Sequence, residues 1–120
     1  MKSKEACPAF EALDLIGKKW TLPLLQQIEM HDSEGFNKLM ARIEKISPKI
    51  LAERLKALER QKIIVKKTEA KQQPAKTTYT LTQKGKELQQ ILSLFRAWME
   101  KHEPMIQGCA QKECVVCEYY

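Results

Sequence analysis

Residues 46–82 read ISPKILAERLKALERQKIIVKKTEAKQQPAKTTYTLT, and the hydrophobic period changes halfway along this stretch. The first half repeats leucine at helical spacing, which predicts a helix over 48–61 with one buried face. Ser47 suits the N-cap because its side chain can accept a backbone N–H. Pro48 suits the first helical position because it has no N–H to lose there. The stretch therefore begins with a well-defined helix.

The second half of the stretch predicts two strands and a short connection. β-branched residues dominate positions 63–68, and positions 77–82 alternate Tyr79 and Leu81 with threonines, as in a half-buried strand. Positions 69–76 between them are polar and include a proline. We therefore predict a β-hairpin with a basic tip directly after the helix.

Four further segments carry apolar residues at helical spacing, and we predict helices over 8–16, 19–30, 36–43 and 83–103. Gly17 is expected to end the first of them in the left-handed conformation, which glycine adopts at little cost. Pro23 must lie in the first turn of the second helix or kink that helix. Thr82 is expected to cap the last helix.

This order of elements predicts the fold class, which is mainly α with a small β-hairpin. The helices over 36–43 and 48–61 are joined by a tight turn, so they form a helix-turn-helix, and the hairpin makes it a winged helix-turn-helix. The chain has 120 residues and a mass of 13.9 kDa, which fits one compact domain. We assign residues 1–103 to this domain and residues 104–120 to a separate cysteine-containing tail.

The last predicted helix is long for so small a domain, since about 21 residues at 1.5 Å each extend about 31 Å. Its apolar stripe consists of Leu88, Ile91, Leu92, Phe95, Trp98 and Met99. This stripe exceeds what one subunit can cover, which predicts a long C-terminal dimerisation helix in a homodimer. The alternative is that the first helix of the same chain packs on the stripe.

Positive charge is concentrated in the middle of the chain. The net charge is +6, but residues 36–86 contain 14 Lys and Arg against 4 Glu, and the remainder is net negative. A basic segment between acidic ends indicates a surface for a polyanion, with double-stranded DNA or RNA as the default partner. The alternative is a solvated, lysine-rich face. The candidate DNA-binding residues are Lys45, Ser47, Lys49, Arg54, Lys56, Lys71, Gln72 and Lys76.

The N-terminal part of a recognition helix is the part that enters the major groove. Ser47, Lys49 and Glu53 are therefore the candidates to face base edges, while basic residues on the hairpin would contact phosphates. A carboxylate repels phosphate. Glu53 therefore fits only as an acceptor from a cytosine amino group or as the ion-pair partner of a nearby lysine, and the ion pair is the favoured alternative.

Five blocks of the sequence resemble the HxlR family of winged-helix transcriptional regulators in order and spacing. These blocks are Cys7-Pro8 with Ala12–Trp20, Phe36–Leu39, Ile46–Leu51, Arg54–Glu59 and Tyr79–Gly85. The resemblance covers about residues 7–100. It implies a homodimer joined through the first and last helices that binds a pseudo-palindromic operator, and a sensing N-terminal cysteine in some members. Pro23 and the cysteine-rich tail depart from the family pattern.

The cysteines suggest a second activity. Cys7 precedes a helix N-terminus, whose dipole favours the thiolate. Its position matches the sensing thiol of the family. The alternative is that Cys7 is a small residue without a sensing role. The tail carries Cys109, Cys114 and Cys117 in a C-x4-C-x2-C pattern. That pattern is consistent with a zinc site, in which His102, Cys7 or a partner's residue would be the fourth ligand. The alternatives are a disulfide and inert thiols. No cofactor is certain.

The sequence argues against several classes of protein. Its apolar runs reach about four residues, whereas a membrane span needs roughly 20, and no secretory signal is recognisable. A cytoplasmic protein without a membrane partner is therefore expected. We predict no enzymatic activity, because no phosphate loop or catalytic triad is recognisable. The alternatives to a DNA-binding regulator are a winged-helix protein–protein interaction module and a redox- or metal-responsive protein that uses the tail cysteines.

Overall fold

The computed structural model describes residues 7–31, 35–71 and 75–108 together with Glu113. In chain order its elements are α1 (Pro8–Ile16), α2 (Thr21–Met30), α3 (Phe36–Arg42), α4 (Pro48–Arg60), β1 (Ile64–Glu69), β2 (Lys76–Leu81), α5 (Gln83–His102) and the 3-10 helix η2 (Pro104–Ile106). The predicted fold class is confirmed. Every predicted helix and strand is present, and its ends lie within about two residues of the predicted ones.

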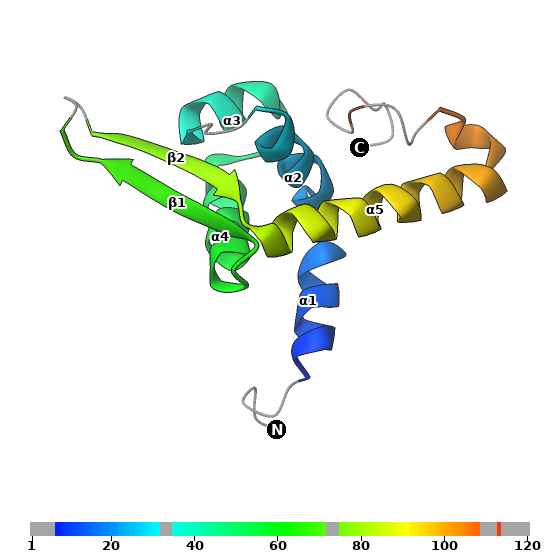
Figure 1. Cartoon of the computed structure of the whole chain (residues 1–120). Coiled ribbons are helices and arrows are strands. Elements are labelled where there is room, and N and C mark those ends of the chain that lie inside the picture. The colour runs from blue at the N-terminus through cyan, green and yellow to red at the C-terminus, as the bar shows by residue number, and fades with distance from the viewer. Residues whose placement is uncertain (1–6, 32–34, 72–74, 109–112, 114–120) are drawn as a thin grey trace.

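The helix-turn-helix lies at the centre of the molecule. Figure 1 shows α2, α3 and α4 packed together, with the β1–β2 hairpin extending to one side. On the other side α5 forms an arm, and α1 projects away from the body. The fully buried side chains of the core come from α2, α3, α4 and the root of the hairpin, and they include Leu24, Leu25, Ile28, Leu39, Leu51, Leu58 and Ile63. From here on the β1–β2 hairpin is called the wing.

The connection between α1 and α2 differs from the prediction. Gly17 has φ −78° and ψ −8°, which is right-handed, so the predicted left-handed cap is wrong. The left-handed residue is Trp20, with φ 79°, and α2 begins after it at Thr21 rather than at position 19. Buried Thr21 Oγ1 donates to the carbonyl of Leu15 at 2.8 Å and holds the reversal. Tertiary contacts, not local preference, thus decide which residue takes the positive φ. Pro23 lies in the first turn of α2, as predicted.

Thr82 joins α4, the wing and α5. Its hydroxyl donates to the carbonyl of Lys62 at 2.6 Å and accepts from the N–H of Gly85 at 3.1 Å, so the predicted N-cap is confirmed. Its own N–H donates to the carbonyl of Ile63 at 3.0 Å. These three bonds connect the root of β1 to the first turn of α5, and they fix how the arm leaves the body.

The wing is antiparallel, with a register that runs from Ile64 opposite Leu81 to Glu69 opposite Lys76. Its root is buried through Ile64 and Tyr79. Burial raises the pKa of the Tyr79 phenol above its ordinary value, and the carboxylate of Glu59 adds to the shift. Tyr79 therefore belongs to the core as a neutral side chain. No helix in the described part of the chain is both long and apolar enough to cross a membrane.

Candidate nucleic-acid interface

The first turn of α4 is positively charged and exposed. Ser47 caps it as predicted, because its Oγ accepts from the N–H of Ile50 at 3.1 Å. Lys45 and Lys49, on either side of the cap, are exposed, and the first turn contains no acidic residue. A helix N-terminus already carries partial positive charge, so a lysine there is unfavourable unless an anion lies close to it. The charge pattern of this turn therefore suits an anionic partner.

Both signs of charge occur further along the exposed face of α4. Glu53 and Lys56 are exposed. Among the described residues Glu53 forms no ion pair with Lys49 or Lys56, so the favoured ion-pair prediction for Glu53 is not observed with these neighbours. Its carboxylate is left facing solvent, where it remains available as an acceptor.

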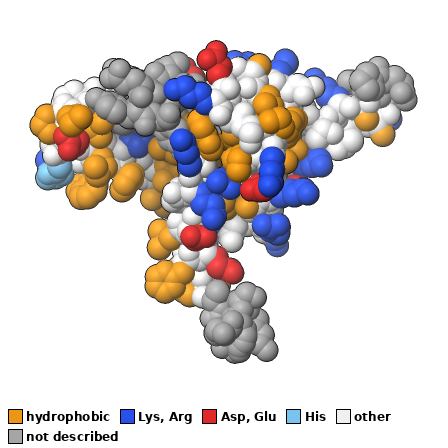
Figure 2. All heavy atoms as spheres, turned by 180° about the vertical axis from the view of Figure 1, so that it is seen from behind, with side chains coloured by type: hydrophobic (Ala, Val, Ile, Leu, Met, Phe, Trp, Pro, Cys, Tyr) orange, Lys and Arg blue, Asp and Glu red, His pale blue; other side chains and the backbone are white. Residues whose placement is uncertain are grey.

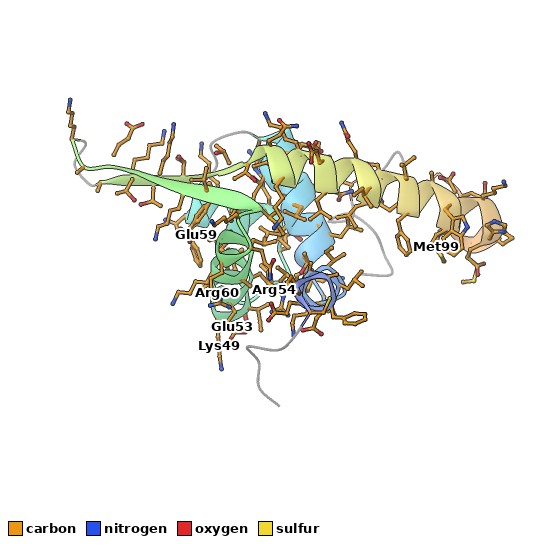
Figure 3. The ribbon with its side chains drawn as sticks, turned by 60° about the horizontal axis from the view of Figure 1, so that its bottom comes forward. Lys49, Glu53, Arg54, Glu59, Arg60 and Met99 are labelled. Atoms are coloured by element: carbon orange, nitrogen blue, oxygen red, sulfur yellow. The ribbon has the colours of Figure 1, made fainter. Side chains whose placement is uncertain are left out.

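Arg54 differs from the other basic residues of α4. It is half-buried, and its Nε donates a hydrogen bond to the carbonyl of Lys19 at 3.0 Å. Figure 3 shows Arg54 on the side of α4 that faces α1, whereas Lys49 and Glu53 point away at the free end of the helix. The structure thus places Arg54 against the α1–α2 connection and apart from the exposed candidates.

The wing carries the second group of cations. Lys66 and Lys67 are consecutive residues of β1 and both are exposed. They are paired with Tyr79 and Thr78 of β2, respectively. Successive residues of a strand point to opposite faces, so the wing presents positive charge on both of its faces. Lys71 and Lys76, which flank the tip, are exposed as well. Gln72 lies outside the described residues.

Two apolar faces are exposed away from these cations. On α5 the side chains that are more than half exposed are Ile91, Leu94, Phe95 and Trp98, and on α1 they are Phe10 and Leu13. Figure 2 shows hydrophobic side chains along the arm and on α1, with Lys and Arg gathered over the middle of the molecule. The alternative in which α1 of the same chain covers the stripe of α5 is wrong, because both faces remain exposed. Leu94, 72% exposed, was not among the predicted residues of the stripe, although it lies one helical turn before Trp98.

The cysteines are placed only in part. Cys7 is exposed and is the N-cap of α1, with its carbonyl accepting from the N–H groups of Phe10 and Glu11. Cys109, Cys114 and Cys117 lie outside the described residues. Within the part that is described, no group of three or more His, Cys, Asp or Glu side chains could hold a metal ion.

The chain reverses direction after α5. The Glu103 side chain accepts from the N–H of Met105 at 3.3 Å, and the Glu100 carboxylate accepts from the N–H of Gly108, which has φ 82°. Glu113 then accepts a hydrogen bond from Nε2 of Gln27, a buried residue of α2, at 2.8 Å. This contact was not predicted, because nothing in the spacing of the tail residues indicates a contact with α2.

Comparison with known proteins supports a regulator. The model of the HxlR-like helix-turn-helix family matches residues 15–107. The HTH-type transcriptional regulator YodB of Bacillus subtilis is 36% identical over 109 residues, covering 89% of this chain and 96% of YodB. The reduced form of YodB superposes with a TM-score of 0.72 at 37% identity, covering 82% of this chain and 97% of that one. The redox regulator HypR in its reduced form has a TM-score of 0.70 at 27% identity, covering 84% of this chain and 98% of that one.

These matches decide between the classes that the sequence left open. They cover both the helix-turn-helix with its wing and the arm formed by α5, and they do not favour an interaction module or a metal-handling protein. Together with the exposed cations of α4 and the wing, they confirm a DNA-binding function. The chain belongs to the HxlR-like helix-turn-helix family of transcriptional regulators.

Proposed function

We propose that this protein is a homodimeric, sequence-specific regulator that places α4 of each subunit in a major groove and its wing on the flanking backbone. The observation that carries the proposal is the division of the surface. Cations are exposed on α4 and the wing, and apolar side chains are exposed on α1 and α5. A second copy would cover the apolar faces and leave the cations free for DNA. Such a regulator acts in the cytoplasm and has no enzymatic activity.

The first turn of α4 is suited to reading bases as well as holding phosphate. The Oγ of Ser47 accepts from Ile50, but its hydroxyl proton is still available to donate. Lys49 is exposed beside it and can donate to guanine O6 or N7 in the major groove. Two subunits related by a twofold axis would then contact half-sites about 10 base pairs apart, centre to centre.

The division of labour between helix and wing predicts different effects for different lysines. Lys71→Ala and Lys76→Ala should weaken binding to all DNA sequences and reduce the salt slope of log K by about 0.9 for each phosphate that is no longer neutralised. Lys49→Ala should also change the preferred base, with a cost of about 1–3 kcal/mol at one operator position. Selection from a random oligonucleotide pool, followed by titration from 50 to 200 mM salt, measures both effects. If all three variants behave alike, the placement of α4 is wrong.

We also propose that DNA binding responds to thiol chemistry at Cys7. In support, Cys7 is exposed and caps the N-terminus of α1, one of the two helices with an exposed apolar face. A thiol there can be oxidised or alkylated without unfolding the core, and the change would alter how α1 meets the second copy. YodB and HypR, whose reduced forms resemble this chain, make a redox response a reasonable expectation.

For the Cys7 proposal we expect that diamide, which oxidises the Cys7 thiols of the two subunits to one disulfide, lowers operator affinity of the wild-type protein at least about tenfold. Dithiothreitol should restore the affinity by reducing that disulfide. Cys7→Ser should bind the operator normally and lose the response. A variant with serine at the three tail cysteines is the matched control, because it removes thiols but keeps Cys7. An unchanged response in Cys7→Ser would assign the sensing to the tail instead.

The tail cysteines are proposed as a second thiol group, either a disulfide or a zinc site. The support is the C-x4-C-x2-C spacing of Cys109, Cys114 and Cys117, which is typical of metal ligands and of disulfide-forming cysteines. Counting zinc and thiols in protein prepared under reducing conditions distinguishes the two forms. One equivalent of zinc with three protected thiols indicates a metal site. Metal-free protein in which added diamide, a two-electron oxidant, joins two of the three thiols in a disulfide and leaves the third free indicates a redox pair.

A further inference from the structure

The backbone between α1 and α2 is held in an unfavourable conformation. Residues 17–20, here called the elbow, end at Trp20, whose φ of 79° is left-handed. For a residue with a side chain this conformation costs roughly 1–2 kcal/mol, so the surroundings must hold it. Two hydrogen bonds on the α2 side contribute: Thr21 Oγ1 donates to the carbonyl of Leu15, and Leu24 N–H donates to the carbonyl of Trp20 at 3.0 Å.

The carbonyl of Lys19 needs a partner from outside this segment. The helical ladder of α2 starts at the carbonyl of Trp20, so the carbonyl of Lys19 lies one residue outside it. The residue four positions further on is Pro23, which has no N–H to donate. The donor comes instead from Arg54 on α4, whose Nε lies 3.0 Å from the Lys19 oxygen.

Arg54 is oriented toward the elbow. It is half-buried, and it faces α1 in Figure 3, whereas Lys49 and Lys56 on the same helix are exposed. Nε is the donor closest to the aliphatic stem of arginine, so its hydrogen bond fixes the direction of the stem toward the elbow. One charge-assisted bond therefore connects the recognition helix to a strained backbone segment.

We propose that Arg54 is a positioning residue, which ties α4 to the elbow and so sets the orientation of the recognition helix relative to α1. The effect of this tie on operator binding rests on the proposed function, but the contact between Arg54 and the elbow does not. α1 carries Cys7 at its N-cap and the exposed apolar side chains of Phe10 and Leu13. A change in the tilt of α1 therefore reaches α4 through the elbow and Arg54. The specificity of DNA reading depends on this residue, although it does not touch DNA.

The test compares Arg54→Met with Lys56→Met, since each variant removes one positive charge from α4 and keeps an unbranched stem. In the free protein, Arg54→Met should speed amide hydrogen exchange at Lys18, Thr21 and Leu24 about fivefold, the effect of losing one hydrogen bond. Lys56→Met should leave these amides unchanged. In operator titrations, Arg54→Met should reduce the ratio of specific to non-specific affinity about tenfold with an unchanged salt slope, and Lys56→Met should reduce the slope by about 0.9.

Unchanged amide hydrogen exchange at the elbow in Arg54→Met overturns the proposal, and so does a reduction of the salt slope equal to that of Lys56→Met.

A measurement on the wild-type protein covers the case in which Arg54→Met does not fold. The Nε proton of Arg54 should exchange with solvent about fivefold more slowly than that of exposed Arg60, and equal rates would overturn the proposal. Both exchange measurements need no DNA. If the wild-type protein binds no operator, the proposed function is wrong. The two exchange measurements then still test the contact between Arg54 and the elbow.

Discussion

Replacing Gly85 by alanine is expected to destabilise the protein by about 3 kcal/mol, one of the two largest effects that the structure predicts. An added Cβ would overlap the carbonyl oxygen of Ile63 and come within 3.2 Å of Leu81 Cδ2. The Ile63 oxygen is backbone and accepts from the N–H of Thr82, so it cannot move away without breaking the junction of β1 and α5. Urea unfolding at fixed protein concentration should show a midpoint lower by about 1.5 M.

Gly17→Ala is the matched control for this substitution. Gly17 is exposed and right-handed, and the nearest atom to its added Cβ is the Leu13 oxygen at 3.3 Å. The change should alter stability by less than about 1 kcal/mol, because alanine adopts this conformation without strain. Equal losses of stability in the two variants would show that the backbone packing at Gly85 is looser than the contacts described above.

Sequence alone predicted the elements whose ends are set by their own residues. Ser47 and Thr82 cap α4 and α5 as expected, since each side chain accepts from an N–H three residues later in the same helix. The wing was predictable for a similar local reason, because alternation across Tyr79 and Leu81 requires one buried and one solvated face. At these caps and in the wing, local chemistry and the final structure agree.

Features that depend on contacts between distant residues were not predictable. Glycine was the reasonable choice for a left-handed residue, but packing gave that conformation to Trp20, next to buried Thr21. Likewise the sequence shows Arg54 only as one more positive charge on α4. Its inward orientation depends on where the carbonyl of Lys19 lies, 35 positions earlier in the chain. The sequence therefore predicted the basic residues of α4 as one group, whereas the structure separates half-buried Arg54, which faces another helix, from exposed Lys49 and Lys56.

The apolar face of α5 carries the other large prediction, which concerns assembly. Leu94→Glu should convert the protein from dimer to monomer at micromolar concentration and reduce operator affinity at least about a hundredfold. Leu94 is 72% exposed in the single chain, so the substitution leaves the monomer core intact. In the dimer, however, the carboxylate would be buried among apolar side chains, and each subunit would have to bind its half-site alone. Sedimentation equilibrium and operator titration measure the two effects.

Ser93→Glu provides the control for Leu94→Glu, because it adds the same charge one residue away. Ser93 is exposed and lies about 100° around the helix from Leu94, away from the face shared by Ile91 and Trp98. It should remain dimeric and bind the operator within about threefold of the wild-type protein, which excludes a simple charge effect on DNA affinity. A Leu94→Glu protein that dimerises as tightly as Ser93→Glu would place the subunit contact elsewhere. The exposed stripe on α5 would then need a different partner, since its four large apolar side chains are too exposed to be explained by the fold of one chain.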